Sequence, residues 1–218
     1  MRTPRIKYFS VLVLTFSVIT CNSKVKTLKP AEIKEYEGEK LSRVTAFREN
    51  SIRGPQQVDI NNYRLKITGL VEIPKQYTYD EIIKNKTKYK KVVTLDCVEG
   101  WSVKILWEGI LVRELIAEAK PRPETKIIIF KAYDGYSTSF PIDYIMKNDI
   151  LMAYKMNDII IPAERGFPFE LVAESKWGYK WIKWINEIEL SADETYRGYW
   201  ENRGYSNEGD LNKEFLER

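Results

Sequence analysis

The sequence predicts an α+β domain in which short strands and short helices are mixed. The chain has 218 residues, of which 44% are hydrophobic and 13% aromatic, so it can bury one good core. The predicted elements do not alternate in a βαβ order, and no glycine-rich phosphate loop follows a strand. These observations disfavour a doubly wound nucleotide fold and favour mixed sheets in a single domain.

The first predicted elements combine strand alternation with a helix signal. Residues 63–71 alternate between polar and apolar side chains, as a half-buried strand does, and Pro74 ends that strand. Thr78 is a plausible N-cap for a helix that runs through Ile83. Two strands are expected next, at residues 92–98 and 103–107, and Glu108-Gly109 is expected to form a turn.

The second half of the chain continues this mixture. Apolar residues recur at helical spacing over 110–116, and Pro121 ends the pattern. Asn157-Asp158 predicts a hairpin turn between two strands. The remaining expected elements are strands at 126–133, 151–156, 159–161, 169–173 and 185–190, a turn at 134–135, helical turns at 141–146, and an aromatic C-terminal loop that packs over the core.

The N-terminus is typical of an export signal. Residues 1–21 combine a basic start with an apolar stretch too short to span a bilayer comfortably, and they end at Cys21. This segment resembles a lipoprotein signal peptide with Cys21 as the lipidated residue; a plain secretory signal or an uncleaved anchor is the alternative. Residues 22–40 are predicted to be a polar tether and residues 41–218 the folded domain. We therefore expect a protein of the bacterial periplasm or cell envelope, held at the membrane by its lipid.

The charge pattern argues against nucleic acid as a partner. The chain has 35 basic and 31 acidic residues, and its net charge is +4. No block of lysine and arginine suits a phosphate backbone.

Cys97 is the residue most informative about chemistry. It ends an apolar strand within residues 94–102, TLDCVEGWS. If Cys21 is acylated, Cys97 is the only free thiol of the mature chain and has no second thiol to pair with. A free cysteine is most often a small buried hydrophobe. A nucleophile would need a base, and the chain has no histidine. A thiolate ligand to a cofactor metal is the third interpretation.

Five motifs in a fixed order carry a family resemblance. They are residues 97–102, 133–137, 176–184, 198–201 and 204–205. This order resembles the molybdopterin-binding domain of the sulfite oxidase family, and within that family the catalytic subunit of periplasmic protein-methionine-sulfoxide reductases. The resemblance covers about residues 41–205. It implies a mixed-sheet molybdopterin-binding fold of the sulfite oxidase type and Mo-molybdopterin as cofactor.

The resemblance also implies roles for individual residues. Cys97 is expected to ligate molybdenum beside the two dithiolene sulfurs of one pterin. Glu99 lies two residues on, so in an extended chain it faces the same side as Cys97. It is expected to orient a bound water or carry a proton, and a surface carboxylate is the alternative. The expected cofactor-binding residues are Asn50, Arg53, Gly54, Cys97, Ala132 (through its backbone), Arg165, Trp181, Ile182 and Lys183.

Of the three lysines at 176, 180 and 183, Lys183 is the best partner for the pterin phosphate, whereas the tryptophans beside them are interpreted as core residues.

Two features depart from the family pattern. Glu170, however, stands where the resembling reductases carry an arginine, and it would repel a phosphate if it pointed at one. The basic start of the chain also lacks the adjacent arginines that mark export of folded, cofactor-loaded proteins.

These observations predict an oxidoreductase that transfers an oxygen atom at a Cys97-ligated molybdenum. The substrate is expected to be a small or protein-bound oxidised molecule. No haem-binding motif, iron–sulfur cysteines or flavin fingerprint is present, so electrons are expected to pass to or from a separate haem or cytochrome protein. The alternatives are a lipid-anchored binding or scaffold module with this fold but no metal, and an aromatic surface that binds a glycan or peptide.

Overall fold

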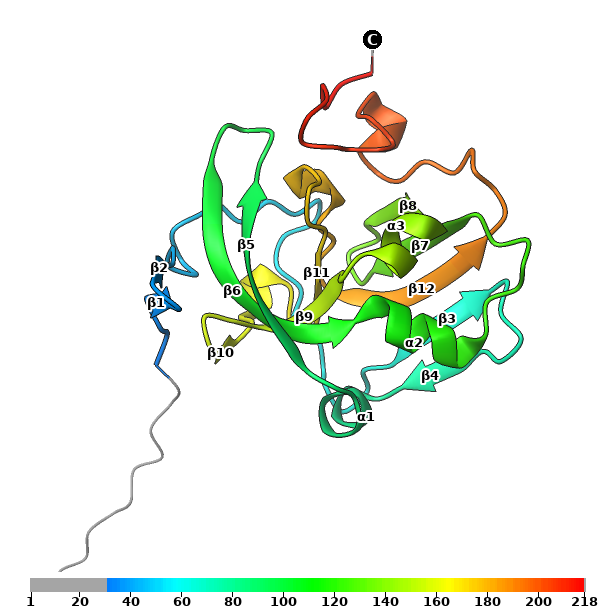
Figure 1. Ribbon diagram of the computed structural model, residues 1–218, viewed down its shortest axis with the longest axis horizontal. Helices are drawn as coiled ribbons and strands as arrows, with labels where there is room; N and C mark the ends of the chain where they lie inside the picture. Colours follow the sequence, from blue (N-terminus) through cyan, green and yellow to red (C-terminus); the bar gives the residue numbers. More distant parts are fainter. Residues whose placement is uncertain (1–30, 218) are drawn as a thin grey trace, which may run out of the picture.

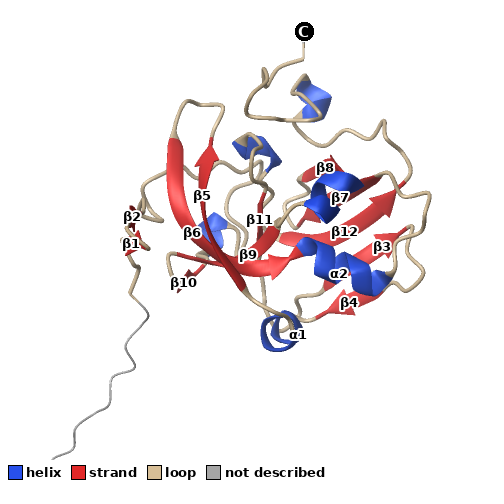
Figure 2. Ribbon diagram, viewed as in Figure 1, coloured by secondary structure: helices blue, strands red, loops and turns tan. Residues whose placement is uncertain are grey.

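The computed structural model describes residues 31–217. Within this range, two larger β-sheets and a few short helices make up one domain (Figures 1 and 2). This arrangement confirms the predicted α+β class with mixed sheets.

The first sheet is antiparallel and carries the Cys97 region. Its strands run in the order β10–β9–β6–β5, and β11 also pairs with β9. The strands are β5 (Tyr89–Asp96), β6 (Ser102–Leu111), β9 (Leu151–Met156), β10 (Ile159–Ile160) and β11 (Glu170–Val172). β5 and β6 form a long hairpin, and the loop that joins them, residues 97–101, stands at the top left of Figure 1.

The second sheet has the order β4–β3–β12–β7–β8. β12 is parallel to β3, and the other pairs are antiparallel. The strands are β3 (Leu65–Gly69), β4 (Lys75–Tyr77), β7 (Ile127–Ala132), β8 (Ser137–Pro141) and β12 (Ile185–Ser191). A separate small hairpin joins β1 (Glu35–Tyr36) to β2 (Glu39–Lys40).

The helices are short, and the sequence predicted their positions well. They are α1 (Tyr79–Asn85), α2 (Val112–Ala119) and α3 (Ile142–Lys147), with 3-10 turns at Ala163–Arg165, Gly178–Lys180 and Glu201–Arg203. Thr78 caps α1 as predicted, because its hydroxyl accepts from the Glu81 N–H while the Glu81 carboxylate accepts from the Thr78 N–H. In residues 31–217, no helix has the length and apolar content needed to cross a membrane.

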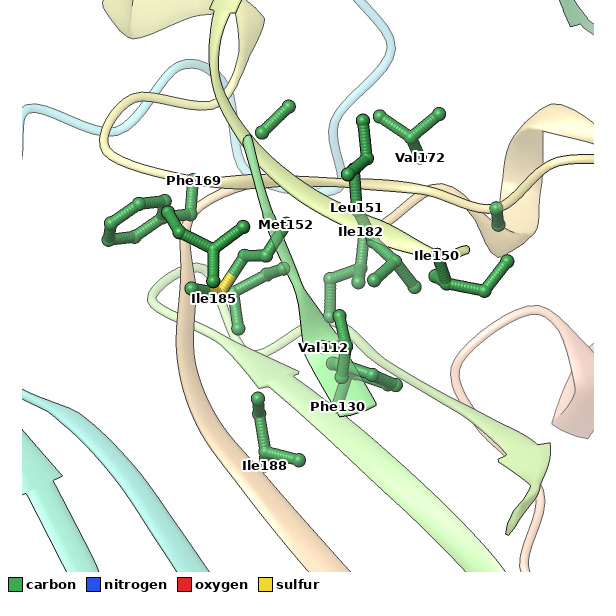
Figure 3. Close-up of a cluster of buried hydrophobic side chains, with 14 of the residues drawn as sticks. Val112, Phe130, Ile150, Leu151, Met152, Phe169, Val172, Ile182, Ile185 and Ile188 are labelled. Atoms are coloured by element: carbon green, nitrogen blue, oxygen red, sulfur yellow. The ribbon is translucent and has the colours of Figure 1, made fainter. Parts of the chain in front are cut away.

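The hydrophobic core joins the two sheets. Figure 3 shows Leu151 and Met152 of β9 in one cluster with Phe130 of β7 and Ile188 of β12, and Val112 of α2 adds to it. All five side chains are buried. Burial of side chains of this size contributes ~1.5–3 kcal/mol each, so the cluster fixes the first sheet on the second.

The predicted turn at Glu108-Gly109 is wrong, because β6 continues through it. Gly109 pairs with Ala153 of β9, and the register shifts between Glu108 and Gly109. A Cβ on Gly109 would come within 2.5 Å of the Met152 carbonyl oxygen. This glycine marks a close approach of two strands rather than a turn. The following helix accordingly begins at Val112, later than predicted.

The described part of the predicted tether, residues 31–40, contacts the domain. The Ile33 N–H donates to the Asn157 carbonyl at 3.1 Å. The Glu32 carboxylate accepts from the Asn157 side-chain amide at 3.0 Å, and Asn157 is buried. Residues 32 and 33 therefore belong to the folded domain, which starts earlier than residue 41. The predicted signal peptide and Cys21 lie outside the described residues.

The C-terminal segment packs over the domain, as predicted. The Lys180 ammonium donates to the Glu201 carboxylate at 2.7 Å, and both side chains are completely buried. The same ammonium donates to the carbonyls of Ser139 and Asn207. Further along, Phe215 packs edge-on against Trp177. These contacts join residues 201–215 to the part of the chain that follows β11.

Candidate functional site

A cleft of about 370 Å³ opens beside the tip of the β5–β6 hairpin. Its lining comes from residues 47–52, the end of β5 and the loop after it, Arg165 and Glu170, and most of residues 178–184. The turn after β7 and the C-terminal segment complete it with Asp134, Tyr136, Trp200 and Tyr205. We call residues 47–52 the cleft strap. Most of the predicted site residues line this cleft, namely Asn50, Cys97, Glu99, Arg165, Trp181, Ile182 and Lys183.

Three predicted residues lie outside the cleft lining. Arg53 and Gly54 follow the cleft strap, and the Arg53 guanidinium lies 3.8 Å from the place of a Cβ on Gly135. Ala132 was expected to offer a backbone contact. Its N–H, however, donates to the Tyr136 carbonyl at 3.0 Å, and its carbonyl accepts from the Gly135 N–H at 3.0 Å. The turn after β7 uses both groups.

Sequence reasoning missed other residues that line the cleft. They are Glu49, Asp134 and Tyr136, together with the aromatic residues Phe47, Trp101, Tyr179 and Tyr205. Asp134 and Tyr136 belong to a motif that the sequence singled out, but only the folded turn shows that they face the cleft. Nothing in the pattern around Glu49 marked it as a partner of a distant lysine.

Cys97 is held rigidly at the end of β5. Its N–H donates to the Trp101 carbonyl at 2.9 Å, and its own carbonyl accepts from the Gly100 N–H at 3.0 Å. Gly100 has φ +83°, which favours glycine in this tight turn. Behind it, a Cβ on Gly178 would be 3.4 Å from the Cys97 Cα. The cysteine therefore sits in a fixed backbone frame.

The electrostatics around the thiol disfavour a nucleophile. Burial raises the pKa of Cys97, and the Glu99 charge adds to this; the neighbouring backbone N–H groups and Asn50 act in the opposite direction. The Asn50 amide nitrogen lies 3.8 Å from the sulfur. A nucleophilic cysteine would need a lowered pKa. A bound metal ion, by contrast, would displace the thiol proton directly.

Glu99 is an ionised carboxylate at the cleft mouth. Its side chain is 42% exposed. The Trp101 indole N–H donates to it at 3.1 Å, and that bond, with Asn50 and Arg48, lowers the pKa of Glu99. The Arg48 guanidinium is 3.9 Å away. Glu99 can therefore accept a proton or a hydrogen bond at neutral pH.

Two cations of the cleft hold the cleft strap. The Lys183 ammonium donates to the Glu49 carboxylate at 2.5 Å. The Arg165 guanidinium donates to the carbonyls of Phe47 at 2.6 Å and Arg48 at 3.0 Å, and it lies 4.0 Å from the centre of the Phe47 ring. The other two lysines of the motif, Lys176 and Lys180, are buried and pair with Asp210 and Glu201. Of the three lysines, only Lys183 lines the cleft.

The tryptophans of the motif are mainly structural. Trp181 is buried, packs on Trp107 with ring centres 5.6 Å apart, and donates to the Lys176 carbonyl at 3.0 Å. Trp184 is buried and donates to the Ala163 carbonyl at 2.7 Å. Trp181 and Trp184 therefore serve the core and also form part of the cleft wall.

Glu170 lines the cleft as a buried acid. It is 4% exposed, and burial raises the pKa of its carboxyl to about 8, while Lys183 and Arg165 act to lower it. At pH 7 the carboxyl is therefore mostly neutral. The sequence suggested that Glu170 would repel a phosphate; in its folded environment it carries little charge to do so.

The arrangement suits one kind of ligand. Asn50 lies next to the Cys97 thiol and the ionised Glu99 carboxylate, and Glu49 connects the cleft strap to Lys183. A small molecule in this cleft could present a soft metal to Cys97 and an anionic group to Lys183 and Arg165.

Comparison with known proteins agrees with this chemistry. A family model described as the oxidoreductase molybdopterin binding domain matches residues 52–200. The match includes Cys97, Glu99, Arg165 and Lys183, whereas Asn50 precedes it.

Several curated proteins are similar in sequence. The uncharacterized oxidoreductase YuiH of Bacillus subtilis is 29% identical over 157 residues, which are 72% of this chain and 78% of that protein. The putative protein-methionine-sulfoxide reductase subunit YedZ1 of Azospira oryzae is 29% identical over 69% of this chain and 57% of its own length. The protein-methionine-sulfoxide reductase catalytic subunit MsrP of Ralstonia nicotianae is 28% identical over 59% of this chain. The chain spans 43% of that MsrP, so it covers only about half of the reductase relatives.

A solved structure shares the fold. The sulfane dehydrogenase SoxCD from Paracoccus pantotrophus superimposes with a TM-score of 0.64 over 83% of this chain and 56% of that chain, at 19% identity.

Proposed function

The chain belongs to the oxidoreductase molybdopterin-binding domain family, the molybdenum enzymes of the sulfite oxidase type, and we propose that it transfers oxygen atoms with Cys97 as the protein ligand to molybdenum. Family membership confirms the resemblance drawn from the motifs, the enzyme class, and Mo-molybdopterin as the cofactor. The observation that carries the proposal is the position of Cys97, a thiol without a disulfide, in a cleft that also exposes Lys183 and Arg165.

The residues of the cleft fit this cofactor. Its volume of about 370 Å³ lies within the ~300–1,000 Å³ of small-molecule and cofactor sites. It offers a soft sulfur for the metal and two cations for a phosphate. Glu170, the residue that argued against a phosphate, is neutral at pH 7 because it is buried. This removes one of the two reasons for a metal-free binding module.

Each residue then has a role toward the cofactor. Cys97 binds the metal through its sulfur and gives up its proton, and the Asn50 amide is placed to stabilise the resulting negative charge. Lys183 and Arg165 hold the pterin phosphate, and Trp181 and Ile182 form the wall beside it. When bound, the cofactor supplies two-electron oxygen-atom transfer.

Glu99 is placed to manage a proton at the cleft mouth. Because its pKa is lowered, it is a carboxylate over the whole neutral range. It can accept a proton from solvent and pass it on to the oxygen that leaves the substrate as water. The indole of Trp101 fixes its orientation.

We propose the reductive direction, with a sulfoxide as substrate. Two of the relatives are named as protein-methionine-sulfoxide reductase subunits, which supports this choice. The reaction consumes two electrons and two protons, converts the sulfoxide to a thioether and releases one water. The sequence contains no motif for haem or an iron–sulfur cluster, so the electrons would come from a separate haem or cytochrome protein.

Location is also a proposal. The basic and apolar start of the chain supports export to the periplasm or cell envelope, and the position of Cys21 supports a lipid anchor. Radioactive palmitate labelling of wild type and Cys21→Ser in cells tests the anchor: we expect label on the wild type alone, and label on both would refute it.

Purified, cofactor-loaded protein tests the activity. With reduced viologen as electron donor, we expect oxidation of the dye on addition of free or protein-bound methionine sulfoxide. Sulfite with ferricyanide tests the oxidative direction, for which we expect little turnover. Turnover with sulfite alone would contradict the reductive direction, and protein that never contains molybdenum would contradict the function altogether.

A further inference from the structure

We propose that Glu170 is a third phosphate-binding residue, which acts as a neutral carboxylic acid that donates a hydrogen bond to the pterin phosphate and makes cofactor binding depend on a proton. This inference rests on the proposed function, because it concerns the same cleft. Glu170 stands where the resembling reductases carry an arginine, and in this role it would bind the pterin phosphate through a neutral hydrogen bond instead of a positive charge.

The position of Glu170 supports this role. It begins β11, pairs with Ala153 of β9, and lines the cleft while only 4% exposed. Its carboxyl makes no hydrogen bond or ion pair with any other group in residues 31–217. A buried carboxyl normally finds a partner, because an unpaired polar group in a protein interior is costly. The carboxyl oxygens of Glu170 are not sealed off from the cleft, so water or a ligand in the cleft can be their partner.

The charged groups around Glu170 are those of the proposed phosphate site. Arg165 and Lys183 are the cations whose charges reach it. Lys183 is paired with Glu49 from the cleft strap, and its charge also reaches Asp134 in the turn after β7. On the neighbouring strand β9, the residue paired with Glu170 is the apolar Ala153. Gly166 allows the approach, since a Cβ there would lie 3.1 Å from the Lys183 Cβ and 3.2 Å from the Glu170 Cβ.

Both cations of the site are already partly engaged. The Lys183 ammonium is engaged by Glu49, and two guanidinium nitrogens of Arg165 are engaged by carbonyls of the cleft strap. A protonated carboxyl supplies one O–H donor, whereas an ionised carboxylate supplies none. Burial raises the pKa of Glu170 to about 8, so the donor form is present at pH 7. A phosphate dianion beside it would raise that pKa further, so that the proton stays on when the cofactor binds.

The consequence is a specific pH dependence. Above pH 8 the free protein must take up a proton on Glu170 before it binds the phosphate. The affinity for the cofactor therefore falls by up to tenfold per pH unit above this point, until the pKa of the bound form is reached. Below pH 7 Glu170 is protonated with or without cofactor, and it contributes no pH dependence.

Anaerobic equilibrium dialysis of the holoprotein at pH 7, 8 and 9 tests this inference. The bound pterin is quantified by its fluorescence after oxidation and the metal by elemental analysis. We expect wild type to lose affinity about fivefold from pH 8 to 9. Glu170→Gln should show no such loss, because the amide is a permanent neutral donor. Glu170→Ala is expected to bind about fivefold more weakly at pH 7, the net effect of one hydrogen bond. Glu124→Gln, a change at an exposed acid that does not line the cleft, is the matched control and should follow wild type.

Infrared spectra provide a second readout that does not depend on dissociation. The difference between wild-type and Glu170→Gln holoprotein at pH 8 should contain the carbonyl band of a protonated carboxylic acid. Equal pH profiles for wild type and Glu170→Gln, or the absence of that band in protein that does contain pterin, would overturn the role of Glu170 alone. Protein without pterin at any pH would overturn the proposed function and this inference with it.

Discussion

The Lys183 ammonium and the Glu49 carboxylate form an ion pair at 2.5 Å across the cleft, between two segments 134 residues apart in the sequence. Both side chains are mostly buried. The Glu49 carboxylate is thus ion-paired with the same ammonium that we assign to the pterin phosphate. A phosphate that binds Lys183 must therefore share the ammonium with Glu49 or displace it. The cleft strap is thus connected energetically to the cofactor, because it loses one of its anchors when the phosphate binds.

Removal of the Glu49 charge should strengthen binding of the phosphate. For Glu49→Gln we expect the affinity for the cofactor to rise about threefold to tenfold, since Lys183 is released from a competing anion. Loss of this partly buried pair should lower the free energy of unfolding of the apoprotein by about 0.5–1 kcal/mol. Equilibrium dialysis and urea denaturation measure the two effects. Glu39→Gln, which removes the exposed partner of Lys104, is the control and should change neither. Weaker binding in Glu49→Gln would show that Glu49 supports the site instead of competing for it.

The stability of the apoprotein should decrease between pH 5 and pH 8 because of Glu170. The pKa of this carboxyl is about 8 in the folded chain and near 4.5 in the unfolded chain, so the folded state binds the extra proton in this window. Each pKa unit corresponds to ~1.4 kcal/mol, which makes the loss about 3–5 kcal/mol at most. Glu170→Gln cannot ionise and should be more stable than wild type at pH 8 but similar at pH 5. Urea denaturation at both pH values measures the free energies of unfolding. If wild type and Glu170→Gln differ by the same amount at pH 5 and pH 8, Glu170 does not titrate in this range.

The buried Lys180–Glu201 pair should be essential for stability. Lys180→Met leaves the Glu201 carboxylate buried with Thr138 as its remaining side-chain donor, which should cost about 3–5 kcal/mol. Thermal and urea unfolding measure the loss. Lys84→Met, which breaks an exposed pair with Asp80, should have no measurable effect. Similar stability of the two variants would contradict the importance of the buried pair.

The catalytic contribution of Glu99 should appear in turnover and not in cofactor content. For Glu99→Gln we expect kcat to fall by ~10²–10⁴, typical of a lost proton-transfer group, with molybdenum and pterin content unchanged. The reduced-viologen assay with methionine sulfoxide measures this. Because the pKa of Glu99 is lowered, wild-type activity should stay constant from pH 8 down to pH 5 as far as this group is concerned. Unchanged turnover in Glu99→Gln would show that Glu99 is a surface carboxylate without a role in proton transfer.

The sequence predicted the local structure well because local signals decided it. The Thr78 cap and the Asn157-Asp158 hairpin each depend on residues close in the chain. The strand predicted over residues 92–98 also exists, but it runs from Tyr89 to Asp96 and ends before Cys97. The Glu108-Gly109 turn failed for the opposite reason. There the glycine serves the close approach of β9, a partner more than forty residues away, which no local pattern reveals.

The site was predictable where a motif carries it and not where folding creates it. The motifs identified Cys97, Glu99 and Lys183, which line one cleft. They gave no sign of Glu49, because its role depends on a contact with Lys183. The state of Glu170 was also hidden, since burial, and not residue type, sets its charge.

The central claim is that the Cys97 sulfur ligates molybdenum, and X-ray absorption at the molybdenum edge tests it most directly. The measurement compares wild-type holoprotein with Cys97→Ser that is confirmed as folded by circular dichroism and contains the same amount of pterin. We predict that the sulfur coordination number of the metal is one lower in the variant, with the dithiolene sulfurs retained. An identical sulfur shell in both proteins would contradict the claim and leave Cys97 as a buried thiol in the wall of the cleft.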